Sequence, residues 1–148
     1  MRKIYVINGP NLNMLGIREP DQYGSESYAS LIDMLKSHSE KTGYELVAYQ
    51  SNHEGDLVDK IQEAYFRKAD GIVMNPGAYT HTSIALLDAI KATKLPTVEV
   101  HISKVEERED FRHKSYTAAK CVGVIAGFGA FSYRLALQAL VNHLDSLK

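Results

Sequence analysis

Short apolar runs alternate along the chain with segments in which apolar side chains recur every three or four residues. The runs are rich in β-branched residues and end at a polar residue or a turn, which is typical of buried strands. The longer segments have the period of amphipathic helices. We predict strands over Lys3–Asn8, Glu45–Gln50, Gly71–Met74, Thr97–Ile102 and Cys121–Ala126.

Four amphipathic helices are predicted between and after these strands. Ser25 is a candidate N-cap of the first helix and Gly43 its stop, and Thr80 or Thr82 is a candidate N-cap of the third. The last helix spans about 131–147. The predicted apolar faces are Tyr28, Leu31, Ile32 and Leu35; then Leu57, Val58, Ile61 and Tyr65; then Ile84, Leu87 and Ile90 or Lys91; and finally Tyr133, Leu137, Leu140, Val141 and Leu144.

Five strands that alternate with helices predict an α/β fold with a parallel sheet covered on both faces. We expect one domain over residues 1–148, a flavodoxin-like three-layer sandwich with the strand order 2-1-3-4-5. Such sheets bind ligands beyond the carboxyl ends of the strands, at the point where the strand order reverses.

Composition narrows the class of protein. The chain is 45% hydrophobic and 24% charged, with a net charge of −1, so nothing indicates a nucleic-acid or membrane partner. The N-terminus enters a strand without a signal-like segment, and the longest apolar run, 121–131, is far shorter than the roughly 20 residues of a membrane span. The single Cys121 is expected to pack in the interior. We predict a cytoplasmic protein.

The polar segment 8–24, NGPNLNMLGIREPDQYG, is too long for an ordinary strand-to-helix connection. Gly9, Pro10 and Pro20 exclude a continuous helix there. The segment carries Arg18 and Tyr23 among amide side chains. A loop of this length in a small domain indicates a lid or a binding loop.

Other polar side chains also follow strands. Because parallel strands end at one edge of a sheet, these side chains are predicted to converge there. Glu99 and His101 alternate on one strand and share a face, so the carboxylate can orient the imidazole and favour a proton donor. The candidates are Asn8, Asn11, Asn13, Arg18 and Tyr23 after the first strand, the segment 75–83 after the third, and Glu99, His101, Ser103, Arg108, Arg112 and His113 around the fourth.

Each of these features taken alone also has an ordinary structural explanation. The Asn75-Pro-Gly sequence is compatible with a simple turn, and His81 with a surface histidine. Glu99 and His101 are compatible with a strand-end ion pair, and the charged run 106–112 with a solvated face from which Arg112 is the exception. A functional site is favoured because all of these side chains are predicted to meet at the same edge of the sheet.

Motifs of other chemistries are missing from the sequence. There is no dinucleotide-binding glycine pattern, no phosphate-binding P-loop, no zinc-ligand spacing and no serine nucleophile elbow. We therefore expect a site without a cofactor and without a metal.

Three segments together resemble the motifs of the type II 3-dehydroquinate dehydratases, in family order and spacing. They are GPNLNMLGIREPDQYG, NPGAYTHTSIALLDA and VEVHISKVEEREDFRHKSY. The resemblance implies a cofactor-free dehydration of 3-dehydroquinate to 3-dehydroshikimate, in the shikimate route to aromatic amino acids or in quinate breakdown. It also implies a flavodoxin-like fold and a homododecamer built from trimers.

The resemblance also implies residue roles. Tyr23 is the general base, Arg18 stabilises its phenolate, and Asn11 helps to hold a water at the enolate oxygen. His101 protonates the departing hydroxyl, and Glu99 orients His101. The substrate-binding residues are Asn75, His81, Ile102, Ser103 and Arg112, with Asp88 contacting substrate from a neighbouring subunit.

Physical chemistry agrees with the role of Arg18. A tyrosine with a pKa of about 10 must lose roughly 3 pKa units to act as a base at neutral pH, and only a nearby cation favours the phenolate. One position departs from the family, because Lys104 stands where asparagine is common. It adds a charge near the site and replaces no proton-transfer group.

Two other classes of protein compete with this interpretation: a non-enzymatic flavodoxin-like module, such as a receiver or flavin-binding domain, and a small phosphate-sugar isomerase. A receiver domain needs acidic residues where this chain has amides, and a flavin carrier would be yellow. A phosphate-sugar isomerase would share the proton abstraction but require a substrate phosphate.

Overall fold

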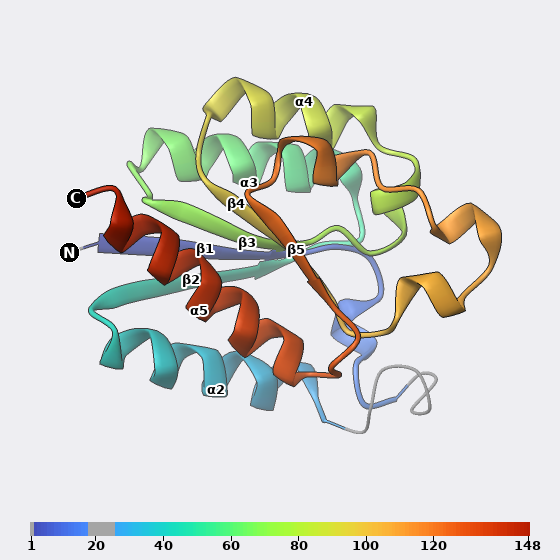
Figure 1. Cartoon of the computed structure of the whole chain (residues 1–148), viewed down its shortest axis with the longest axis horizontal. Helices are drawn as coiled ribbons and strands as arrows, with labels where there is room; N and C mark the ends of the chain where they lie inside the picture. Colours follow the sequence, from blue (N-terminus) through green and yellow to red (C-terminus); the bar gives the residue numbers. More distant parts are fainter. Residues whose placement is uncertain (1, 18–25) are drawn as a thin grey trace.

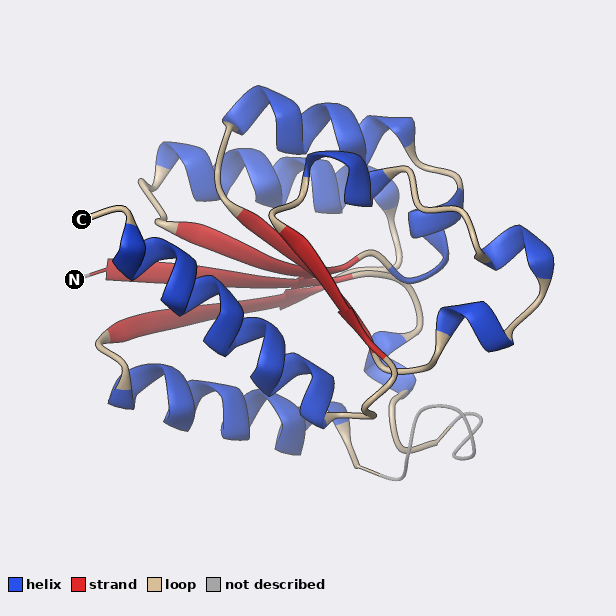
Figure 2. Ribbon diagram, in the orientation of Figure 1, coloured by secondary structure: helices blue, strands red, loops and turns tan. Residues whose placement is uncertain are grey.

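A five-stranded parallel sheet forms the centre of the molecule, in the order β2-β1-β3-β4-β5 (Figures 1 and 2). The computed structural model of the chain describes residues 2–17 and 26–148. The predicted strand order is confirmed. The strands are β1 (Arg2–Asn8), β2 (Tyr44–Gln50), β3 (Gly71–Asn75), β4 (Thr97–His101) and β5 (Gly123–Ala126).

Helices cover both faces of the sheet, so the predicted three-layer arrangement is confirmed (Figure 1). One apolar core lies under two of them and a second lies under the other two, because the inner strands β1, β3 and β4 are buried on both sides. The first pair is α2 (Tyr28–Lys41) and α5 (Phe131–Ser146), and the second pair is α3 (Glu54–Phe66) and α4 (Ile84–Thr93).

The predicted apolar faces of α2 and α5 are correct, but those of the other two helices need correction. In α4 the buried residues are Leu86, Ala89, Ile90 and Thr93, whereas Ile84 is exposed. In α3, Ala64 is buried and Tyr65 is exposed. Both helices are apolar over more than one face near these positions, so the periodicity alone does not identify the buried one.

Helix ends also differ from the prediction. Ser27, not Ser25, caps α2 by accepting a hydrogen bond from the backbone N–H of Ser30; Ser25 lies outside the described residues. Ser83 caps α4 in the same way, in place of Thr80 or Thr82. Gly43 follows the end of α2 with a φ of +86°, as its role as a stop requires.

β5 is shorter than predicted and lies at the edge of the sheet. It begins at Gly123, so Cys121 and Val122 precede it. Cys121 is a free thiol that packs, half-buried, against the core beneath α3 and α4. Burial raises the pKa of the thiol to about 12, and the negative charge of Glu99 adds to the effect, so the thiol stays protonated.

The strand order reverses between β1 and β3, and their last residues, Asn8 and Asn75, are partners in the parallel register. Gly9 follows directly, with its N–H donating to the Asn75 carbonyl at 2.7 Å. A Cβ at Gly9 would lie 2.3 Å from the carbonyl oxygen of Pro76, so only glycine allows the two loops to meet here. The loops that follow β1 and β3 are thereby held together at the carboxyl edge of the sheet.

Candidate active site

A pocket lies beyond the carboxyl ends of β1, β3 and β4, as the strand order predicts. The loop after β1 supplies one wall, the 3₁₀ turn η2 (Gly77–His81) supplies another, and the segment after β4 completes it. Eight of the side chains singled out in the sequence line this pocket: Asn11, Asn75, His81, His101, Ile102, Ser103, Arg108 and Arg112.

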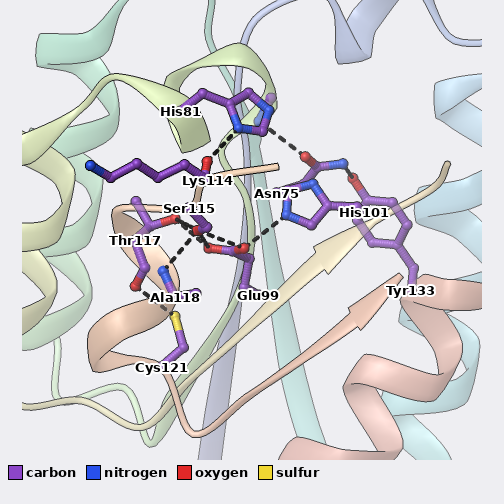
Figure 3. Close-up of polar contacts among 11 residues, drawn as sticks. Asn75, His81, Glu99, His101, Lys114, Ser115, Thr117, Ala118, Cys121 and Tyr133 are labelled. Atoms are coloured by element: carbon purple, nitrogen blue, oxygen red, sulfur yellow. Dashed lines mark hydrogen bonds and ion pairs between the residues drawn. The ribbon is translucent and has the colours of Figure 1, made fainter. Parts of the chain in front are cut away.

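A buried carboxylate–imidazole pair lies at the end of β4. Glu99 and His101 leave the same face of the strand, and His101 Nε2 lies 2.8 Å from Glu99 Oε2 (Figure 3). A carboxylate can only accept hydrogen bonds, so Nε2 carries a proton. Nδ1 is then the ring nitrogen that remains for a ligand, where it can hold a second proton and release it.

Two hydroxyl groups complete the surroundings of Glu99. The Ser115 hydroxyl lies 3.1 and 3.2 Å from the two carboxylate oxygens, and the Thr117 hydroxyl donates to Oε1. Burial alone would raise the pKa of Glu99, but His101 and these two hydroxyls outweigh burial and hold the pKa below its usual value. Glu99 therefore stays ionised although it is 1% exposed.

His81 is held by the backbone of the loop that follows the fourth strand. Its Nδ1 lies 2.7 Å from the carbonyl oxygen of Lys114 (Figure 3). Because a carbonyl only accepts, Nδ1 carries the proton and the other ring nitrogen, Nε2, is an acceptor in neutral imidazole. His81 can therefore accept a hydrogen bond from a ligand hydroxyl, or donate one when protonated.

Asn75 belongs to a chain of buried hydrogen bonds that joins four elements. Its Nδ2 donates to the Tyr133 hydroxyl at 2.9 Å, and that hydroxyl donates to Asn8 Oδ1 at 2.6 Å. Asn8 Nδ2 continues the chain to the Tyr28 hydroxyl at 3.2 Å. The Gly77 N–H donates to Asn75 Oδ1 at 3.0 Å, so the orientation of the Asn75 amide is determined and its second N–H remains for a ligand.

The remaining lining residues differ in how they are held. Asn11 has a φ of +69°, and its backbone N–H donates to Asn52 Oδ1 at 3.0 Å. Arg112 is half-buried and paired with Glu109 through its Nε atom, which leaves its terminal nitrogens as donors for an anion. Ile102 lies just past β4 rather than within it and is buried.

Other predicted residues lie elsewhere. Arg18 and Tyr23 fall outside the described residues. Asp88 is exposed on α4 and is not among the described residues that line the pocket. Lys104 also points elsewhere: its Nζ pairs with Glu107 at 3.4 Å, and its side chain passes Gly127. The unusual lysine therefore adds no lining group to the described part of the pocket.

Sequence reasoning missed three residues that support the site. Ser115 and Thr117 hold Glu99 from 16 and 18 positions away, and Tyr133 reaches Asn75 across 58 positions. The only signal for the first two is that polar residues directly follow the charged run after β4. Tyr133 carried no such signal, because it fits the apolar face of α5.

Within residues 2–17 and 26–148, no group of three or more His, Cys, Asp or Glu side chains is arranged to hold a metal ion. Among the same residues, no helix is long and apolar enough to cross a membrane.

Comparison with known proteins gives consistent results. A model of the family described as dehydroquinase class II matches residues 2–141. The chain is 54% identical to a 3-dehydroquinate dehydratase of Clostridium perfringens, over 97% of this chain and 99% of the relative. It is 55% identical to the 3-dehydroquinate dehydratase of Caldicellulosiruptor bescii, over 98% of this chain and 100% of the relative. A crystal structure of type II dehydroquinase from Butyrivibrio crossotus superposes with a TM-score of 0.92, at 53% identity, covering 94% of this chain and 97% of that one.

Proposed function

The chain belongs to the class II dehydroquinase family, and we propose that the pocket at the carboxyl edge of its sheet is where it dehydrates 3-dehydroquinate. The enzyme is a hydro-lyase that eliminates water from this substrate to give 3-dehydroshikimate. The reaction serves the shikimate route to aromatic amino acids or the breakdown of quinate.

The Glu99–His101 pair is the observation that carries the assignment to this pocket. Elimination of hydroxide from carbon is slow unless an acid protonates the leaving group. His101 is the proposed acid, with Nε2 bonded to Glu99 at 2.8 Å and Nδ1 delivering the proton to the departing hydroxyl. Glu99, kept ionised by Ser115 and Thr117, orients the ring and stabilises it while it holds both protons.

The proposed base is Tyr23, on the segment that precedes α2. As a phenolate it removes the proton from the carbon beside the ketone, and the electrons of the broken C–H bond move into an enolate. Arg18 supplies the cation that favours the phenolate. Asn11, which lines the pocket, is proposed to hold the water that stabilises the enolate oxygen. Collapse of the enolate expels the hydroxyl group, which leaves as water with the proton from His101.

The other lining residues are proposed to bind the substrate. Asn75 presents its second amide N–H, and Arg112 and Ser103 offer further donors to the carboxylate and hydroxyl groups of the substrate. His81 offers Nε2 to a substrate hydroxyl, since its Nδ1 is occupied by the Lys114 carbonyl. Ile102 provides an apolar contact.

The test is an ultraviolet assay with metal-stripped protein and 3-dehydroquinate, because the conjugated product absorbs where the substrate does not. We expect prompt growth of absorbance that disappears in Tyr23→Phe, which removes only the hydroxyl. Tyr79→Phe is the matched control, since this tyrosine donates to the backbone carbonyl of Asn52 and should retain activity. Full activity in Tyr23→Phe would reject the proposed base, and no activity in folded wild-type protein would reject the pocket assignment.

We also propose that the protein assembles as a homododecamer built from trimers and that Asp88 serves the pocket of a neighbouring subunit. Asp88 is exposed on α4 and lies away from the pocket of its own chain, with the exposed Ile84 one turn before it. An exposed apolar residue beside a carboxylate suits a contact between subunits.

Subunit mixing tests this arrangement. Asp88→Asn and His101→Ala proteins are each expected to have low activity, and unfolding and refolding them together should restore a fraction of it. Restoration requires one chain to supply His101 and its neighbour Asp88. An Asp88→Asn protein with wild-type activity, or a mixture without gain, would contradict the role of Asp88.

The proposed location is the cytoplasm, and the proposed partner is the small-molecule substrate without nucleic acid or membrane. The free, half-buried Cys121 suits a reducing compartment, and the net charge of −1 suits a protein that does not bind polyanions. Fractionation of cells that express a tagged chain tests the location.

A further inference from the structure

A second groove lies at the opposite edge of the sheet from the active-site pocket, with a volume of about 420 Å³. It forms where α4 ends and where β4 and β5 begin, and α5 closes its far side. In Figure 1 this is the side on which the two chain termini lie. Its floor is apolar and consists of Ile90, Leu95, Pro96 and Val122.

The rim of the groove is basic. Among the residues that the structure describes, Lys91, Lys94, Lys120 and His143 line it, and no carboxylate does. Within the described part of the chain, none of these three lysines has an ion-pair partner, although lysines elsewhere pair with Glu63, Glu107 and Asp145. The chain as a whole has a net charge of −1, so this accumulation of positive charge is local.

We propose that this groove binds a small organic anion that carries at least two negative charges on an apolar ring or chain. Three unpaired ammonium groups around one cavity repel each other, and a multivalent anion removes that repulsion. The apolar floor gains from burying a ring or chain, which an inorganic ion lacks. The volume lies within the range of small-molecule sites, about 300–1,000 Å³.

The groove is physically connected to the catalytic pair, so we assign it a regulatory role, an assignment that rests on the proposed function. Lys120 belongs to the 3₁₀ turn η5 (Thr117–Lys120), whose first residue donates a hydrogen bond to Glu99. The backbone N–H of Val122 donates to the carbonyl of Thr97 at 2.7 Å, at the start of the strand that ends in His101. An anion that holds Lys120 against α4 therefore restrains the turn that positions Glu99.

Isothermal titration calorimetry with naphthalene disulfonate tests the site directly, because this probe combines two charges with an apolar ring system. We compare the wild type with a groove variant, Lys91→Gln/Lys94→Gln/Lys120→Gln. The matched control is Lys36→Gln/Lys41→Gln/Lys68→Gln, which removes the same charge from exposed positions elsewhere. Lys68 matches Lys94 in backbone conformation, with a φ of +58° against +57°.

We expect the groove variant to bind the probe roughly tenfold more weakly than the wild type, and the control to stay within about twofold. Inorganic phosphate should bind the wild type more weakly than the disulfonate. Equal affinity in all three proteins, including the case in which the probe occupies the active-site pocket, overturns the proposal. If the triple variant fails to unfold cooperatively, Lys91→Gln and Lys120→Gln are measured singly against Lys36→Gln.

A rate measurement tests the regulatory part. Saturating disulfonate should change kcat of the wild type and leave that of the groove variant unchanged. Binding without any change in kcat would overturn the regulatory role. Absence of dehydratase activity would instead contradict the proposed function, and the calorimetric result would still decide whether the groove binds anions.

Discussion

His101 Nε2 lies 2.8 Å from Glu99 Oε2, and both side chains project from the same face of β4 because they are two positions apart. The strand itself therefore sets the geometry of the pair. Both residues lie within the strand, and both are buried. A preformed carboxylate–imidazole pair needs little reorganisation when it transfers a proton.

Glu99→Gln should lower kcat by roughly 10²-fold with little effect on KM. Glutamine keeps the size of the side chain but removes the negative charge that faces His101 when the ring holds two protons. Steady-state assays of product absorbance measure both constants. A kcat within twofold of the wild type would show that Glu99 has no role in the proton transfer.

Thr117→Val should destabilise the protein at neutral pH by about 1.5–3 kcal/mol, because a buried carboxylate loses a donor. Folding lowers the pKa of Glu99, so the stability that its ionised form contributes is complete above its unfolded pKa and is lost as pH falls through the folded pKa. The variant should raise the folded pKa, so its deficit should shrink as the pH falls and both proteins bind the proton.

Urea unfolding at neutral and acid pH measures this difference. Thr93→Val is the matched control, since Thr93 is also buried but donates to the neutral carbonyl of Ile90. Its cost should be smaller and independent of pH. The same pH dependence in both variants would contradict the assignment of Thr117 to Glu99.

Tyr133→Phe should raise KM by roughly tenfold while changing kcat less, because Asn75 loses the acceptor that orients its amide. The unfolding free energy should fall by about 1–2 kcal/mol, since Asn8 Oδ1 also loses its donor. Tyr44→Phe controls for stability: Tyr44 is equally buried, but its hydroxyl bonds Arg2 and Asp145 far from the pocket. Equal changes of KM in both variants would mean that Tyr133 acts only through stability.

Lys104→Asn should leave kcat/KM within about twofold of the wild type. The Lys104 ammonium pairs with exposed Glu107, and a surface pair of this kind contributes about 0–1 kcal/mol. Comparing the two proteins at low and at high salt adds a check. If Lys104 acted on the substrate, the difference in kcat/KM between wild type and variant would depend on the salt concentration. A large gain or loss in the variant would place Lys104 at the substrate.

Much of the fold followed from local patterns. The alternation of strands and helices was predicted correctly, because the pattern of apolar positions is a property of neighbouring residues. The strand order 2-1-3-4-5 was expected from the flavodoxin-like fold and not from these patterns, and the structure confirms it. The buried face of α4 was wrong, since Ile84 and Leu86 are both apolar and only contact with α3 and the sheet selects between them. The role of Ser83 as N-cap was missed for a similar reason, because Thr80 and Thr82 are equally suitable residue types.

The sequence alone determined that Asn11, Asn75 and Ser103 lie at the carboxyl edge of the sheet, because each of them is at or just past the end of a strand and parallel strands end together. It also determined the Glu99–His101 pair, which the alternation of a strand places on one face. Only the tertiary structure decided what supports them: Ser115 and Thr117 around Glu99, Tyr133 beneath Asn75, and three lysines around a groove at the far edge. These contacts join residues from separate elements, and a hydrogen bond between distant positions leaves no periodic trace in the chain.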